Sequence, residues 1–153
     1  MRETLFNWLQ PRTADARVLD LFAGSGALGL EALSRGAAQV TFVEKDRRAA
    51  AAIEALAQEW RENSVSVVCS DAIAWLSRAH QSASFDLVFI DPPYDSKLLS
   101  GTAAALASSG LLAPDARVYL ECRAREAMPA LPDGWQSVRD GRAGEVGYHL
   151  FAT

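Results

Sequence analysis

The sequence predicts an α/β fold, a doubly wound sheet that is mostly parallel with an antiparallel C-terminal edge strand. Two observations lead to this prediction. Apolar, strand-like runs recur along the chain between Ala-rich stretches of helical spacing, which is typical of a parallel sheet with helices on both faces. The last part of the chain has a hairpin pattern instead, so an antiparallel strand is expected at the sheet edge. The five parallel strands are expected at Val18–Phe22, Val40–Val43, Val65–Cys69, Leu87–Ile90 and Val118–Glu121.

The helices and the hairpin are located by the same periodicities. Before the first strand, Arg2–Leu9 carries apolar residues at four of its positions and is expected to form a short amphipathic helix. Helical spacing also predicts helices at Leu30–Arg35, Arg47–Arg61 and Ala72–Arg78. The closing hairpin is expected to consist of Trp135–Arg139, a Gly-containing turn at Asp140–Gly144, and Glu145–Phe151.

Length and composition limit the classes of function. The 153 residues are half apolar and 22% charged, which is typical of one globular domain, residues 1–153. No apolar run is long enough to cross a bilayer, and the first residues lack the layout of a signal peptide, so we expect a cytoplasmic protein with no membrane partner. The two cysteines, Cys69 and Cys122, and the two histidines, His80 and His149, lack metal-ligand spacing, and we expect no metal.

A glycine-rich turn follows the first predicted strand. Gly24, Gly26 and Gly29 fit the pattern G-x-G-x-x-G, in which the first glycine permits a tight turn, the second lets a ligand approach closely, and the third lets the helix pack on the strand. The second strand ends at Glu44, twenty positions after Gly24, where an acid can bind two ribose hydroxyls. The pattern therefore predicts a cofactor that contains a nucleoside.

Charge indicates which cofactor this is. Asp20 precedes the turn, where a carboxylate would repel a diphosphate but could pair with the ammonium of S-adenosyl-L-methionine, directly or through water. The alternative for Asp20 is a solvated acid or a cap on the loop. Asp71 follows the third strand and could either accept from an adenine amino group or cap the next helix, with Ser70 as the competing cap. The predicted cofactor-binding residues are Asp20, Phe22, Ala23, Gly24, Ser25, Gly26, Glu44, Lys45, Asp71, Ala72 and Asp91.

The tetrapeptide Asp91-Pro92-Pro93-Tyr94 follows directly on the fourth strand. An exocyclic base amine is a poor nucleophile, because its lone pair is delocalised into the ring. Asp91 and the carbonyl of Pro92 could accept its two hydrogens, the prolines would fix the backbone, and Tyr94 could stack on a flipped base. These four residues are the predicted catalytic site. The alternative is a simple strand-ending turn, since Asp-Pro pairs often begin turns.

The predicted sheet brings these two motifs together. In a doubly wound sheet, ligands bind beyond the carboxyl ends of the strands where the strand order reverses, and the first and fourth strands lie side by side there. Asp20–Gly26 and Asp91–Tyr94, about seventy positions apart, should therefore face each other across one crevice. A donor methyl group would then lie beside the bound amine.

Three blocks of the sequence carry a family resemblance. They are Arg2–Leu9 (RETLFNWL), Asp20–Ala37 (DLFAGSGALGLEALSRGA) and Asp91–Tyr94 (DPPY). Together they resemble the bacterial 16S ribosomal RNA guanine-2-amino methyltransferases of the small subunit. The resemblance spans nearly the whole chain and implies a seven-stranded class I methyltransferase fold. It also implies S-adenosyl-L-methionine held by the Asp20–Gly26 turn, Glu44 and Asp71, and a base pocket formed by the DPPY tetrapeptide.

The resemblance also implies a basic segment of several tens of residues before the Arg2–Leu9 block. In this sequence the block follows Met1 directly. On this basis the chain looks truncated, and part of the RNA contacts and of the cofactor lid would be missing. The net charge of −4 and pI near 5.1 do not suit a protein that neutralises many phosphates by itself. Candidate local contacts, with solvated arginines as the alternative, are Arg123, Arg125, Arg139 and Arg142.

The sequence therefore predicts methyl transfer from S-adenosyl-L-methionine to the 2-amino group of a guanine in 16S ribosomal RNA. The expected partner is 16S ribosomal RNA within a small-subunit assembly particle, with RNA bound through local arginine patches as the alternative. The expected state of the chain is a monomer. Three rival interpretations remain: an adenine amino-methyltransferase, a nicotinamide-dependent oxidoreductase, and a truncated binding module that holds cofactor without turnover. Asp20 and the lack of an evident acid pair for hydride transfer argue against the oxidoreductase.

Overall fold

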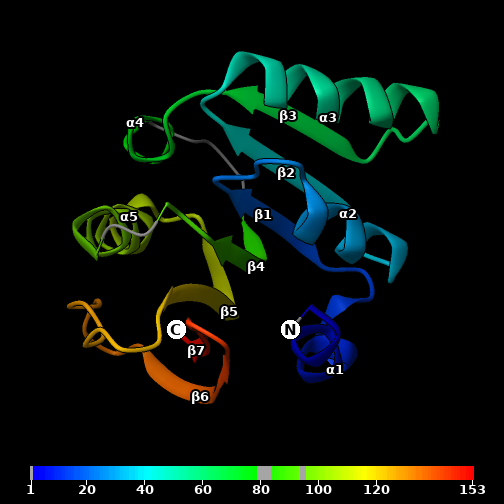
Figure 1. The fold of residues 1–153 in the computed structure, drawn as a ribbon. Helices are drawn as coiled ribbons and strands as arrows, with labels where there is room; N and C mark the ends of the chain where they lie inside the picture. Colours follow the sequence, from blue (N-terminus) through cyan, green and yellow to red (C-terminus); the bar gives the residue numbers. More distant parts are fainter. Residues whose placement is uncertain (1, 79–83, 94–95) are drawn as a thin grey trace.

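The computed structural model describes residues 2–78, 84–93 and 96–153. Seven strands form one sheet in the order β3-β2-β1-β4-β5-β7-β6, with helices packed against it (Figure 1). The helices are α1 (Arg2–Thr13), α2 (Ala27–Ser34), α3 (Arg47–Glu59), α4 (Ala72–Leu76) and α5 (Ser96–Ser109). The strands are β1 (Arg17–Leu21), β2 (Gln39–Glu44), β3 (Val65–Cys69), β4 (Phe85–Ile90), β5 (Leu112–Arg123), β6 (Gln136–Ala143) and β7 (Val146–Ala152).

The predicted fold class is confirmed. Strands β1 to β5 are parallel, and β1 pairs with both β2 and β4, so the strand order reverses at β1 as expected. The C-terminal strand β7 is antiparallel to β5 and to β6, but it lies one position inside the sheet, and β6 forms the edge. This order follows from composition: β7 buries Tyr148, Leu150 and Phe151, whereas nearly every residue of β6 is exposed. The more apolar strand of the hairpin takes the position covered on both sides.

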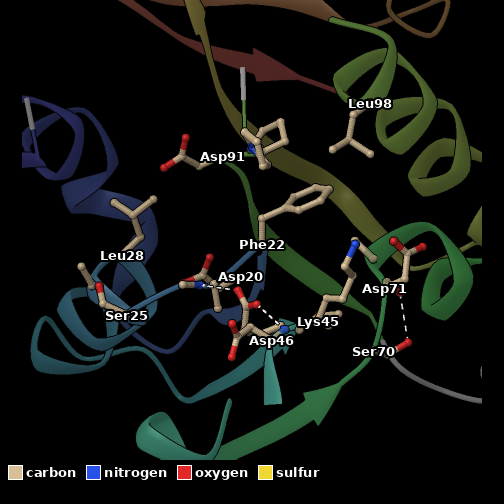
Figure 2. Close-up of a pocket in the computed structure, with 18 of the residues that line it drawn as sticks. Asp20, Phe22, Ser25, Leu28, Lys45, Asp46, Ser70, Asp71, Asp91 and Leu98 are labelled. Atoms are coloured by element: carbon tan, nitrogen blue, oxygen red, sulfur yellow. Dashed lines mark hydrogen bonds between the residues drawn. The ribbon is translucent and has the colours of Figure 1, made fainter. Parts of the chain in front are cut away.

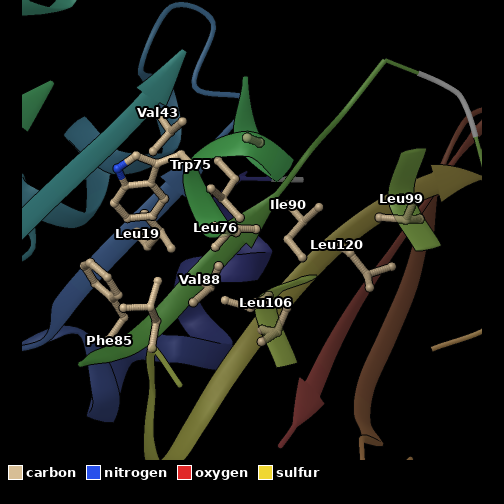
Figure 3. Packing of buried hydrophobic residues seen from close by; sticks show 14 of the residues in the cluster. Leu19, Val43, Trp75, Leu76, Phe85, Val88, Ile90, Leu99, Leu106 and Leu120 are labelled. Carbon is tan, nitrogen blue, oxygen red and sulfur yellow. The ribbon is translucent and has the colours of Figure 1, made fainter. Parts of the chain in front are cut away.

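Helices cover both faces of the sheet. On one face, α1, α2 and α3 pack on a cluster that includes Phe6, Ala32 and Ile53. On the other face, α4 and α5 contribute Trp75, Leu76, Leu99 and Leu106 to a second cluster, which Figure 3 shows around Leu19, Val88 and Ile90. Residues of β1, β2, β4 and β5 alternate between the two clusters, as the period of two in a strand requires.

Helix α1 is attached to the first of these faces by aromatic contacts. Phe6 meets Phe89 of β4 edge to face, with ring centroids 6.0 Å apart, and Trp8 stacks on Tyr148 of β7 at 5.4 Å. The helix runs to Thr13, four residues beyond its predicted end, and the Thr13 hydroxyl donates to the carbonyl of Leu9. Within the described residues, no helix is long and apolar enough to span a membrane.

Several element boundaries differ from the prediction for local reasons. Strand β1 ends at Leu21 rather than at Phe22, because Phe22 has a left-handed backbone with φ of 58°. The hairpin turn is shorter than predicted, since β6 continues to Ala143 and Gly144 takes a φ of 59°. Helices α3 and α4 end two residues earlier than expected, at Glu59 and Leu76.

Candidate functional site

Four acids lie at the carboxyl ends of neighbouring strands, on the face covered by α1, α2 and α3. Each follows, by two positions, a buried residue of the cluster on that face, and residues two apart in a strand point to the same side. The pairs are Val18 and Asp20, Phe42 and Glu44, Phe89 and Asp91, and Tyr119 and Glu121. All four acids line one cavity of about 820 Å³, which opens at the carboxyl edge of the sheet (Figure 2).

The loop between β1 and α2 forms one wall of this cavity. Phe22 and Gly24 both have positive φ, 58° and 59°, a conformation that is uncommon for a bulky residue and that is often held in place at functional sites. The Ala23 N–H donates to the carbonyl of Val43 at 3.1 Å, and the Gly24 N–H donates to Glu44 Oε1 at 2.7 Å. The loop is therefore tied to β2, and Phe22, Ala23, Gly24 and Ser25 line the cavity.

The three glycines have roles that differ in part from those predicted. Gly29 is the packing position, because a Cβ there would lie 2.4 Å from the ring of Phe42. Gly26 was expected to face the ligand, but it is buried and does not line the cavity. It caps α2 with φ of 81°, and a Cβ there would point toward the side chain of Ile53, 3.2 Å away. Gly24 lines the cavity instead, and a Cβ there would meet only the carbonyl oxygen of Phe22, 4.0 Å away.

Glu44 is held at the end of β2 by two backbone donors. Its Oε1 accepts from Gly24 and its Oε2 accepts from the Asp46 N–H, each at 2.7 Å. Asp46 in turn caps α3 by accepting from Arg48 and Ala49. A carboxylate oxygen accepts more than one hydrogen bond, so Glu44 can still accept from ribose hydroxyls in the cavity.

Asp20 is nearly buried, with 2% of its surface exposed, yet it contributes to the cavity wall. Its Oδ2 accepts from the Gly29 N–H at 3.0 Å. Burial raises the pKa of Asp20 to about 8; the Gly29 hydrogen bond works in the opposite direction, and the charge of Glu44 adds to the increase. A cation in the cavity would reverse this penalty by favouring the ionised carboxylate.

At the end of β3, Asp71 takes the capping role that the sequence left open. Its Oδ2 accepts from the Ala74 N–H at 3.0 Å, whereas Ser70 donates its hydroxyl to the carbonyl of Asp71. Capping and ligand binding are compatible here, because Asp71 also lines the cavity together with Ala72 and the exposed Lys45. Figure 2 shows Asp71 and Lys45 on the same side of the cavity.

Asp91 stands at the mouth of the cavity, with Pro92 buried beneath it and Pro93 exposed. The residue as a whole is exposed, but its carboxyl group is packed between protein groups. Its pKa is raised by burial, by a hydrogen bond with Glu121, and by the charges of Glu121 and Asp20. The fourth predicted catalytic residue, Tyr94, lies outside the described residues.

Glu121 is the strand-end acid of the lining that the sequence motifs did not reveal. It is 8% exposed, and its Oε1 accepts from the Tyr119 hydroxyl at 2.8 Å. The available signal was its position two residues after the apolar Tyr119 at the end of a strand next to β4. Apolar lining residues that were also missed are Ala27, Leu28, Val43 and Leu98.

The arginines proposed for RNA contacts lie away from the lining. Arg123 lies 3.7 Å from Glu126 and Arg125 lies 3.7 Å from Glu145 in exposed ion pairs, while Arg142 donates to the carbonyl of Gly144. Exposed pairs of this kind hold their side chains only weakly. In the described part of the chain, no group of three His, Cys, Asp or Glu residues is arranged to hold a metal ion.

The charge of the cavity discriminates between cofactors. Four strand-end acids face the space, joined by Asp46 and Asp71, and Lys45 is the single basic residue among the lining residues. A diphosphate would be repelled by this lining, whereas a nucleoside joined to a sulfonium and an ammonium would be attracted. The cavity is large enough for such a molecule, and the donor set therefore fits S-adenosyl-L-methionine.

Comparison with known proteins agrees with this assignment. The family model described as conserved hypothetical protein 95 matches residues 1–152. The chain is 42% identical over 151 residues to ribosomal RNA small subunit methyltransferase D of Escherichia coli strain K12, covering 99% of this chain and 75% of the relative. The protein of the same name from Haemophilus influenzae is 35% identical over 153 residues, which are 99% of this chain and 79% of that one.

Solved structures lead to the same family. An Escherichia coli protein assigned as a methyltransferase matches with a TM-score of 0.94 and 41% identity, covering 98% of this chain and 84% of that chain. The predicted class I methyltransferase fold and the predicted cofactor, S-adenosyl-L-methionine, are thus confirmed. With near-complete coverage by both the family model and these relatives, the chain belongs to the ribosomal RNA small-subunit methyltransferase family.

Proposed function

We propose that this protein transfers a methyl group from S-adenosyl-L-methionine to the exocyclic 2-amino group of a guanine in 16S ribosomal RNA. One observation carries the proposal. The loop that follows β1 and the Asp91-Pro92-Pro93 segment that follows β4 line the same cavity, because β1 and β4 are neighbours and Leu21 pairs with Ile90. A cavity suited to a cationic methyl donor thus opens beside a carboxylate suited to an amine.

The cofactor would be held by residues from three strand ends. Asp20 and the backbone of the Phe22–Ser25 loop would receive the methionine part, and Glu44 would accept from the ribose hydroxyls. Asp71, with Ala72, would lie at the adenine, because its Oδ1 is not used in capping α4. Lys45 would lie in the same part of the cavity wall.

The methyl donor supplies an electrophilic carbon on a positively charged sulfur. Asp91 would accept one hydrogen of the guanine amine and the Pro92 carbonyl the other, so that the nitrogen lone pair is directed at this carbon. The transfer would replace the C–S bond of the donor by an N–C bond, the bonding electrons staying with the leaving thioether, and one proton would have to leave the nitrogen. Asp91, which would hold this amine, is proposed to receive that proton.

The substrate proposed is an assembled small-subunit particle rather than naked RNA. With a net charge of −4, the chain offers little general attraction for phosphates. Ribosomal proteins on a particle would supply docking contacts that the chain lacks. In this proposal the chain acts as a monomer and residues 1–153 form one catalytic domain.

The test is methylation of purified small subunits, naked 16S RNA and duplex DNA, each incubated separately with methyl-labelled S-adenosyl-L-methionine. RNA and particles come from cells that lack the gene, so that the target is unmodified, and the labelled nucleotide is identified after nuclease digestion. We expect label in guanine of the particle, at the 2-amino group. Label in adenine would favour the rival amino-methyltransferase, and cofactor binding without transfer to any acceptor would favour the binding module.

A further inference from the structure

Asp91 and Glu121 are neighbours across two parallel strands. Ile90 of β4 pairs with Leu120 of β5, so the residues that follow each of them lie side by side, with their side chains on the same face. Both line the cavity, and the neighbouring Glu121 helps to raise the pKa of the Asp91 carboxyl group. The amine site proposed above therefore contains two adjacent carboxyl groups rather than one.

Glu121 is fixed in place by the aromatic layer beneath it. Tyr119, itself 1% exposed, donates its hydroxyl to Glu121 Oε1 at 2.8 Å and packs edge to face on Phe89. On the other side, Glu121 pairs in register with Tyr148 of β7, whose ring is stacked by Trp8. Because the Tyr119 hydroxyl donates its proton, Glu121 acts as an acceptor in this contact, and Glu121 also lines the cavity.

Two adjacent hydrogen-bond acceptors match the base-pairing edge of guanine and not that of adenine. Guanine presents two neighbouring donors, the N1–H and the 2-amino group, whereas adenine presents its amino group beside a bare N1 acceptor. An acceptor at Glu121 would bond the guanine N1–H but would face the lone pair of adenine N1. A site built to bond a donor rejects an analogue that lacks it, because the buried acceptor is left unpaired.

We propose that Glu121 is a specificity-determining residue, which accepts the N1–H of the target guanine while Asp91 holds its 2-amino group. The inference rests on the proposed function and deepens it, since it assigns the choice of guanine over adenine to a residue of β5. Tyr119 is a positioning residue in this arrangement, because it acts on the base only through Glu121.

A purely structural role for Glu121 predicts a different pattern. If Glu121 only satisfied the Tyr119 hydroxyl, its replacement would lower stability or cofactor affinity and would slow transfer to every acceptor by the same factor. A role in recognition changes the ratio of rates between two acceptors. The ratio is therefore the quantity to measure, and it also cancels differences in the intrinsic reactivity of the acceptors when compared between enzyme variants.

The probe is 2-aminopurine, which keeps the 2-amino group of guanine but has a bare N1. RNA carrying guanine or 2-aminopurine at the mapped position is assembled into particles, and kcat/KM is measured for wild type, Glu121→Gln and Tyr119→Phe. Glu54→Gln, an exposed acid on α3, is the matched control. We expect wild type and Glu54→Gln to prefer guanine by about 10- to 100-fold, the loss associated with one hydrogen bond to a charged group. Glu121→Gln should narrow this preference to within about threefold, because its amide can donate to a bare N1.

The outcomes separate the two proposals. If wild type methylates no guanine in the particle, the proposed function fails and this inference fails with it. If wild type methylates guanine but treats 2-aminopurine equally, or if Glu121→Gln keeps the wild-type preference, the role of Glu121 is wrong and the proposed function stands. Should Glu121→Gln fail to bind cofactor, Tyr119→Phe decides, since a full wild-type preference in that variant contradicts the positioning of Glu121 by the hydroxyl.

Discussion

The buried carboxyl of Asp20 predicts that cofactor affinity depends on pH. In the empty protein the pKa of Asp20 is raised to about 8, mainly by burial, so near neutral pH this group carries a proton. The ammonium and sulfonium of S-adenosyl-L-methionine favour the ionised form, so binding should release that proton. Affinity must then increase as the pH rises toward 8.

The size of the effect follows from the shift. Each pH unit below the raised pKa costs about 1.4 kcal/mol, or a factor of about ten in the dissociation constant, provided the complex is ionised throughout. From about pH 5.5 to 7.5 the dissociation constant should therefore fall by about 50- to 100-fold, a range in which the cofactor's own α-amino group stays mostly protonated. Asp20→Asn should remove most of this slope and leave weak binding at every pH.

Isothermal titration calorimetry across this range, in buffers of different ionisation enthalpy, measures both the affinity and the proton released. Asp133→Asn, an exposed acid in the loop before β6, provides the matched control and should keep the wild-type slope. S-adenosylhomocysteine carries the ammonium but lacks the sulfonium charge. The change of its dissociation constant with pH should therefore report the contribution of the ammonium alone. A wild-type dissociation constant that varies by less than about threefold over this range would contradict the role given to the buried carboxyl.

Three further predictions concern Asp91, Gly29 and Gly26. Asp91→Ala should abolish methyl transfer while changing cofactor affinity by less than about tenfold, measured by single-turnover labelling and calorimetry, because the carboxyl is proposed to hold the amine; equal loss of both would contradict this division. Gly29→Ala should lower the free energy of unfolding by about 1 to 3 kcal/mol in urea, since its Cβ would lie 2.4 Å from Phe42, and a neutral result would show that α2 can move away from β2. Gly26→Val should also destabilise, by strain at φ of 81° and contact with Ile53, rather than by blocking the cavity; reduced affinity with unchanged stability would contradict that assignment.

Most of the fold could be predicted because its signals are local. Apolar runs and helical spacing located the five parallel strands, and the meeting of the two motifs followed from the general strand order of doubly wound sheets. The position of β7 between β5 and β6 could not be predicted from a hairpin pattern alone. It depends on which strand buries more apolar surface against β5, and that is a tertiary property.

The candidate site divides in the same way. Residues that belong to short motifs, such as Gly24 and Asp91, were identified because the motif itself limits their conformation. Glu121 belongs to no motif, and its relevance arises from the register of β4 and β5. The place of Gly26 also depends on tertiary packing: the pattern gives the spacing of the glycines, but it cannot show that a Cβ at Gly26 would lie 3.2 Å from Ile53 of α3.

The acids that suit this cavity to a cation also destabilise the empty protein. In the unfolded chain Asp20 ionises near the ordinary aspartate pKa of 3.8, whereas in the fold it keeps its proton up to about pH 8. The folded state thus binds more protons over this range, and its stability must decrease as the pH rises through it. Asp91 adds to the trend, because its pKa is also raised. A ligand that brings positive charge to Asp20 reverses its penalty, so the binding of cofactor and the stability of the carboxyl end of β1 are linked through the same proton. Near neutral pH the empty site therefore holds a protonated Asp20, and the cost of ionising this buried carboxyl group is met when the charged methyl donor binds.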